Sequence, residues 1–187
     1  MRKYLLVFAS LLVVIAIIAL SACGSDYIWF TGNGSVSMYP TFWAAPGQRV
    51  YFRRTQDISR GDIVVYRHFD SNHMKRVIAL GGDTIEFKLC LESELDFDIF
   101  WIYLNGQFLD ESEYLAPFGE HEHGSSWTGI GFWLYDGFIV SESRDHFFLA
   151  VPNGYFFTMG DNRDGSLDGR NYGPVSMDNL IGVFAGR

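Results

Sequence analysis

The chain has 187 residues, of which 48% are hydrophobic and 17% aromatic, and its formal net charge is -8 at neutral pH. This length suits one folded domain with a buried core, and the composition excludes wholesale disorder. The negative charge opposes a phosphate backbone, and the lysines and arginines form no run that could overcome it locally, so nucleic acid is not expected as a partner. Cys23 and Cys90 are the only cysteines, which excludes a disulfide framework.

The first segment is typical of a membrane anchor. Tyr4–Ala22 contains nineteen uncharged residues and follows Arg2 and Lys3. A helix of this length spans about 28 Å, close to the hydrocarbon thickness of a bilayer, and basic residues favour the cytoplasmic side. We expect a cytoplasmic N-terminus at 1–3, a single-pass anchor in the cell membrane at 4–22, and an extracytoplasmic domain at 25–187.

A lipoprotein signal is the alternative interpretation of this segment. Leu20-Ser-Ala-Cys23 resembles the lipobox of bacterial lipoproteins, in which Cys23 would carry the lipid. Either interpretation tethers the domain at the same outer surface, and the sequence leaves both open.

The remainder is expected to form a mainly β domain with a barrel-like or two-sheet arrangement. Short stretches rich in β-branched and aromatic residues alternate with Gly, Pro, Asn and Asp, and no helical period extends beyond three turns. Residues 88–150 are the least regular part and are expected to contain surface loops or a small inserted subdomain. The predicted strands are 49–52, 63–67, 76–80, 84–87, 101–104, 147–151, 155–159 and 180–184.

Four sequence blocks carry the strongest functional signal: Gly34–Thr41 (GSVSMYPT), Arg60–Tyr66 (RGDIVVY), Lys75–Asp83 (KRVIALGGD) and Gly160–Arg170 (GDNRDGSLDGR). In this order and spacing they resemble the motifs of type I signal peptidases, the Ser-Lys enzymes that remove signal peptides from exported proteins. Residues 88–150 match that family only loosely. The resemblance implies a signal-peptidase-like catalytic domain behind the anchor.

The resemblance also implies the catalytic residues. Ser37, the serine of a Ser-Met-x-Pro motif, corresponds to the nucleophile, and Lys75 corresponds to the general base. A serine hydroxyl needs a base to take its proton, and a lysine can do so only when it is neutral, which burial among apolar neighbours favours. Ser35 projects from the same face as Ser37 if the backbone is extended, and we expect it to help bind the oxyanion.

Residues of the fourth block are implied to support the site. Ser166 matches the family serine that hydrogen-bonds and orients the lysine amine. Asp161, Asp168 and Arg170 match a polar cluster that braces the site together with Gly160, with Asp168 and Arg170 on one face if the segment is extended.

The sequence departs from the family pattern in two places. Gly81-Gly-Asp83 stands where Pro-Gly-Asp is common, and Gly165 and Gly169 occupy positions that are often Asn and Ser. These changes put the rigidity of the two loops in doubt, but they remove no catalytic group.

No metal or cofactor is expected. The acidic loop after Asp161 lacks the glutamate that an EF-hand would need at position 175, and His121 and His123 are interpreted as part of a solvated loop. The resemblance implies preprotein signal peptides, with small residues at -1 and -3, as the substrate, and the anchor makes the lipid bilayer the other expected partner.

The aromatic residues around Ser37 indicate how the domain meets the membrane. Either a core or a surface that enters the headgroup region would suit these aromatic residues, which are Trp29, Phe30, Phe42 and Trp43.

A specialised peptidase of the same clan, dedicated to conjugation or pilus substrates, is one alternative function. The other is a non-catalytic surface lipoprotein that uses the fold as a binding module.

Overall fold

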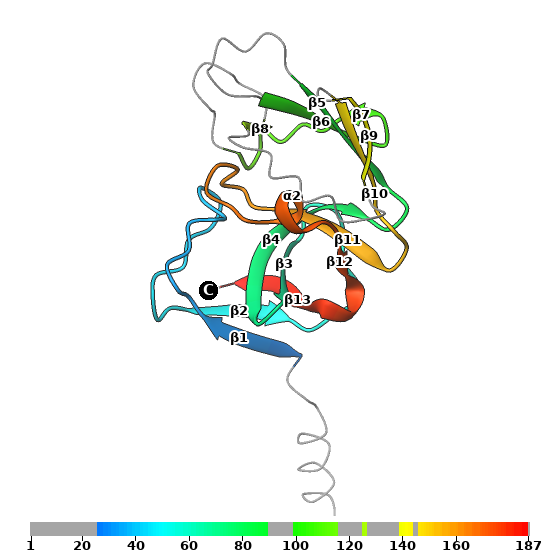
Figure 1. Ribbon diagram of the computed structural model, residues 1–187. Helices are drawn as coiled ribbons and strands as arrows, with labels where there is room; N and C mark the ends of the chain where they lie inside the picture. The colour runs from blue at the N-terminus through cyan, green and yellow to red at the C-terminus, as the bar shows by residue number, and fades with distance from the viewer. Residues whose placement is uncertain (1–25, 90–98, 116–124, 127–138, 144–145, 187) are drawn as a thin grey trace, which may run out of the picture.

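The computed structural model describes residues 26–89, 99–115, 125–126, 139–143 and 146–186. They form a seven-stranded antiparallel sheet, ordered β1-β2-β13-β3-β4-β11-β12, and a six-stranded one, ordered β7-β6-β5-β10-β9 with β8 paired to β6 (Figure 1). The strands are β1 (Tyr27–Thr31), β2 (Arg49–Arg53), β3 (Ile63–His68), β4 (Ser71–Leu80), β5 (Thr84–Leu89), β6 (Ile99–Leu104), β7 (Gln107–Phe108), β8 (Ser125–Ser126), β9 (Ile139–Ser143), β10 (His146–Ala150), β11 (Tyr155–Met159), β12 (Val175–Ser176) and β13 (Leu180–Gly186).

The mainly β, two-sheet arrangement agrees with the sequence, and each of the predicted strands is present. Among the described pairings neither sheet closes into a barrel. Among the predicted strands, the bounds of β4 differ most: it begins at Ser71 rather than at Arg76, because its first three residues are polar and hide the strand pattern. The sequence did not predict β1, β7, β8, β9 or β12. The only α-helix in the described part is the four-residue α2 (Gly169–Tyr172), and a 3-10 turn covers Met177–Asn179.

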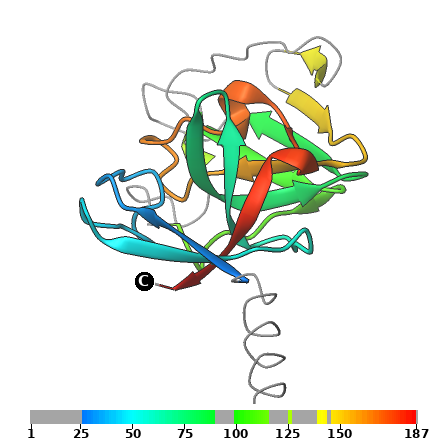
Figure 2. The same cartoon turned by 90° about the horizontal axis from the view of Figure 1, so that it is seen from below.

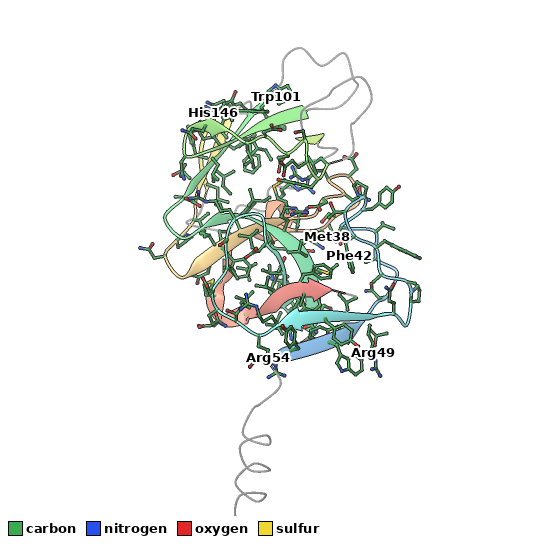
Figure 3. All side chains as sticks on the ribbon, turned by 180° about the vertical axis from the view of Figure 1, so that it is seen from behind. Met38, Phe42, Arg49, Arg54, Trp101 and His146 are labelled. Atoms are coloured by element: carbon green, nitrogen blue, oxygen red, sulfur yellow. The ribbon has the colours of Figure 1, made fainter. Side chains whose placement is uncertain are left out.

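Alternation in β2 shows how one lobe of the core is built. Val50 and Phe52 point inward while the residues between them are exposed. The inward pair packs with Met38 and Phe42 from the loop that follows β1, and Figure 3 places these two labelled side chains inside the domain. Burying an apolar side chain of this size contributes about 1.5 to 3 kcal/mol to the free energy of folding, so the packing of these two side chains fixes the loop that carries Ser37 against the sheet.

The turn between β4 and β5 is braced by Asp83. Its carboxylate accepts hydrogen bonds from Arg60 at 2.5 and 2.9 Å, from the Asn105 amide at 2.8 Å and from the Leu80 N–H at 2.8 Å. Burial opposes the charge, but these bonds outweigh it and lower the pKa of Asp83. Gly81 stands where the family commonly has proline. A side chain there would place its Cβ 2.8 Å from the Pro152 carbonyl oxygen, so the close packing at this turn favours glycine.

Candidate active site

Ser37 lies in the loop between β1 and β2, half-buried at the surface of the first sheet. Its carbonyl accepts a hydrogen bond from the Asn162 N–H at 3.1 Å, and the Asn162 side chain donates to the Val36 carbonyl at 3.2 Å. Gly160 permits this close approach, because a Cβ there would lie 2.4 Å from the Ser37 carbonyl oxygen and 2.2 Å from Ser166 Oγ. Two loops more than a hundred residues apart in sequence therefore hold the serine.

Lys75 projects from β4 and is 4% exposed. Its Nζ lies 2.9 Å from Ser37 Oγ and 3.1 Å from the Met74 carbonyl oxygen. Burial lowers the pKa of Lys75 from 10.5 to about 8, although the nearby carboxylates of Asp168 and Asp161 oppose this shift. About half of the amine is therefore neutral at pH 8 and can accept the proton of the serine hydroxyl.

Ser35 is exposed and lies next to Ser37, as the sequence predicts. The two hydroxyl oxygens are 3.3 Å apart, and the Ser37 N–H donates to Ser35 Oγ at 3.4 Å. Both groups therefore lie where an oxygen bound near Ser37 could receive their hydrogens.

Ser166 makes no hydrogen bond to Lys75 within the described residues. Its hydroxyl oxygen is buried and, within the described residues, makes no hydrogen bond of good geometry. It lies close enough to Asp168 to help lower the pKa of that carboxyl. Its role in orienting Lys75 remains a prediction.

Asp161 and Asp168 each pair with an arginine. Asp161 accepts two bonds from Arg76, the residue after Lys75, at 2.9 and 2.6 Å. Asp168 accepts from the Arg170 guanidinium at 2.9 and 3.0 Å and from the Gly160 N–H at 2.8 Å. Burial opposes the Asp168 charge, but Arg170 outweighs it and lowers the pKa of Asp168.

The expectation that Asp168 and Arg170 share one face of an extended segment is wrong. Asp168 is the N-cap of α2, and its side chain accepts a hydrogen bond from the Arg170 N–H at 3.1 Å. The two side chains meet because the helix begins between them, and a helix of one turn leaves no periodic signal in the sequence.

Four further residues of this neighbourhood were not singled out from the sequence. Arg76, Asn162 and Arg163 stand inside the quoted blocks, where charged or amide side chains flanking the expected catalytic residues could have indicated them. Glu111 pairs with Arg163 in the buried interior. It belongs to the irregular region 88–150 and gave no signal.

A pocket of about 530 Å³ opens beside Ser37 and Lys75. His73 on β4 lines this pocket and keeps a neutral ring at physiological pH, because burial, the charge of Lys75 and His68 lower its pKa to about 4. Its apolar wall is formed by Met38, Phe42, Ala44, Val50, Phe52 and Val65.

Two expectations fall mostly or wholly outside the described residues. Within the described ranges no helix is long and apolar enough to cross a bilayer, and the expected anchor at Tyr4–Ala22 lies outside them. The same part of the chain contains no cluster of three or more His, Cys, Asp or Glu side chains arranged for a metal ion, and His121 and His123 also lie outside it.

The sequence comparisons identify the family to which this two-sheet domain belongs. The family model for signal peptidase, peptidase S26, matches residues 2–186, and the chain belongs to this family. It is a hydrolase of the signal peptidase I type.

Individual relatives are similar over most of the chain. Signal peptidase I V of Bacillus subtilis is 33% identical over 92% of this chain and 92% of its own length. Signal peptidase I S of the same organism is 33% identical over 91% of this chain and 80% of its own. A crystal structure of a signal peptidase I from Enterococcus faecalis is 24% identical over 69% of this chain and 97% of that chain, with a TM-score of 0.43, and the family assignment does not depend on it.

Proposed function

We propose that the protein removes signal peptides from exported preproteins, with Ser37 as nucleophile and Lys75 as general base. The observation that carries this proposal is the 2.9 Å contact between Lys75 Nζ and Ser37 Oγ, made by an amine whose burial lowers its pKa to about 8. No histidine is needed as base, because a neutral lysine amine can take the serine proton.

The proposed reaction passes through an acyl-enzyme. Ser37 Oγ attacks the scissile carbonyl carbon while its proton moves to Lys75 Nζ. The oxyanion receives hydrogen bonds from the Ser37 N–H and from the Ser35 hydroxyl, which turns from Ser37 Oγ toward it. Lys75 then protonates the leaving amine, and the C–N bond breaks. A water gives its proton to Lys75 as it attacks the ester, and collapse of this second intermediate returns the proton to Ser37.

The edge of β4 provides a place for the substrate backbone. Residues Ser71–Lys75 pair with β3 on one side, whereas the pairing of β4 with β11 starts only at Arg76. Among the described strands the other edge of Ser71–Lys75 is therefore open, and it borders the pocket. An extended peptide that adds to this edge would place its side chains alternately into the apolar pocket, as proposed for small residues at -1 and -3.

The catalytic domain is proposed to be extracytoplasmic and held at the bilayer by the anchor at 4–22. β1 begins at Tyr27, five residues after Ala22, so the extended connection is at most about 18 Å long. Trp29 and Trp43 are 48% and 45% exposed, in keeping with a surface that enters the headgroup region. For Phe42 the core is the correct one of the two interpretations, because its ring is buried beside Phe184.

Bilayer contact can be measured by tryptophan quenching. With the full chain in vesicles that contain brominated phosphatidylcholine, we expect Trp29→Phe combined with Trp43→Phe to remove most of the quenching. Trp101→Phe is the matched control, because Trp101 lies at the opposite end of the molecule from Arg49, which stacks on Trp29 (Figure 3). Quenching that disappears with Trp101 instead would place the wrong end at the membrane.

The pH dependence of cleavage follows from the lowered lysine pKa. We expect kcat/KM to rise about tenfold per pH unit below pH 8 and to level off above it, because only neutral Lys75 accepts the serine proton. At pH 6 the rate is expected to be about 100-fold below the plateau. Two results would contradict the assignment of Lys75 as base: a kcat/KM that is constant from pH 6 to 9 in folded enzyme, or an acid limb with its midpoint near pH 10.5.

The activity itself is tested by incubating the purified full chain with a preprotein that carries an Ala-x-Ala site. Mass spectrometry should find a new N-terminus directly after the second alanine, and leucine at -1 should prevent cleavage. Cleavage confined to conjugation or pilus substrates would favour the specialised peptidase. Absence of cleavage of any preprotein would favour the binding module.

A further inference from the structure

A buried carboxylate outside the dyad organises one side of the site. Glu111 follows β7 and is 7% exposed. Its Oε2 accepts a hydrogen bond from Arg163 Nη1 at 2.7 Å, and its Oε1 accepts one from Arg163 Nη2. The Tyr114 hydroxyl donates to Oε1 at 2.5 Å. Because both charges are buried, each depends on the other for compensation.

Arg163 connects Glu111 to the loop that contacts Ser37. Its Nε donates to the Gly160 carbonyl at 3.1 Å. Asn162, in the same loop, donates its N–H to the Ser37 carbonyl at 3.1 Å. The chain of contacts thus runs from Glu111 through Arg163 to the backbone of Ser37.

Tyr114 reaches the other half of the dyad. Its ring lies 4.1 Å from the guanidinium carbon of Arg76, which is the residue next to Lys75. Its carbonyl accepts a hydrogen bond from Thr41 Oγ1 at 3.3 Å. Burial, followed by the charge of Glu111, raises the pKa of Tyr114, so its hydroxyl remains a donor at any working pH.

We infer that Glu111 and Tyr114 are positioning residues for peptide cleavage. They fix the position of the Gly160–Asn162 loop, which contacts the Ser37 backbone, relative to Arg76, the residue next to Lys75. This inference rests on the proposed roles of Ser37 and Lys75. Neither positioning residue lines the pocket beside the dyad. Their loss should therefore slow the chemical step and leave peptide binding nearly unchanged.

A loosened loop also changes the surroundings of the lysine. Lys75 owes its lowered pKa first to burial, and water that enters beside it would favour the charged amine. The acid limb of the pH profile should then move to higher pH. A variant that only lowers the fraction of folded enzyme would not move that limb.

The test compares Glu111→Gln and Tyr114→Phe with Glu113→Gln in the full chain. Glu113 is exposed on the same segment and is the matched control. We expect Glu111→Gln to lower kcat about 10- to 100-fold with KM within about threefold, and to raise the pH of the acid limb. Tyr114→Phe keeps the ring on Arg76 and loses one hydroxyl, so it should fold and show a smaller decrease in kcat. Glu113→Gln should match the wild type.

Other results would overturn the inference. A folded Glu111→Gln variant with the kcat of the wild type would overturn it. So would a decrease in kcat that matches the fraction of unfolded enzyme while the acid limb of the pH profile stays at the wild-type pH. If Ser37→Ala and Lys75→Arg are inactive while Glu111→Gln is normal, the inference alone fails. If Ser37→Ala and Lys75→Arg are active, the proposed function itself fails.

Discussion

Lys75→Arg is expected to lower preprotein cleavage by about 10⁴-fold or more. A guanidinium keeps its proton at any working pH and cannot accept the one from Ser37. The native amine is 4% exposed, and burial lowers its pKa to about 8. The measurement is the rate of appearance of the mature N-terminus with a model preprotein.

Lys88→Arg is the matched control for this variant. Lys88 is half exposed on β5 and pairs with Glu86 at 3.0 Å, away from the dyad. The same substitution there should leave cleavage unchanged. Lys75→Met tests whether the added charge of arginine is the cause of inactivity. Methionine is uncharged but has no amine to accept the serine proton, so this variant should be equally inactive. Near-normal processing by Lys75→Arg would refute the assignment of the base.

Ser37→Ala is expected to abolish cleavage, whereas Ser35→Ala should slow it by about 10- to 1000-fold. Removing the Ser37 hydroxyl removes the atom that attacks the carbonyl. Removing the Ser35 hydroxyl removes one of two hydrogen-bond donors for the oxyanion, and the Ser37 N–H remains. Single-turnover assays at pH 8 can resolve both values.

Ser112→Ala is a suitable control, because Ser112 is exposed on a separate segment. Mass spectrometry of quenched reactions should find the acyl adduct on the peptide that contains Ser37. The reverse ranking of the two serines would show that Ser35 is the nucleophile.

The candidate dyad could be predicted because both of its residues stand in local blocks with a family pattern. The strands could be predicted where apolar and polar residues alternate, as in Arg49–Arg53. β1 was missed because its aromatic residues, Tyr27–Thr31, follow the apolar N-terminus and offer no separate signal. Glu111 was missed for another reason: its partner Arg163 is 52 residues away, and no local pattern reports such a pair.

The position of β13 has a consequence for the biogenesis of the enzyme. β13 lies between β2 and β3, so the hairpin beside Ser37 and the hairpin that carries Lys75 join through it. Figure 2 shows this last strand, in red, against β2 in cyan. The sheet that brings Ser37 and Lys75 together cannot be completed until residues 180–186 have been synthesised. We therefore expect a nascent chain, or one truncated before residue 180, to lack proteolytic activity.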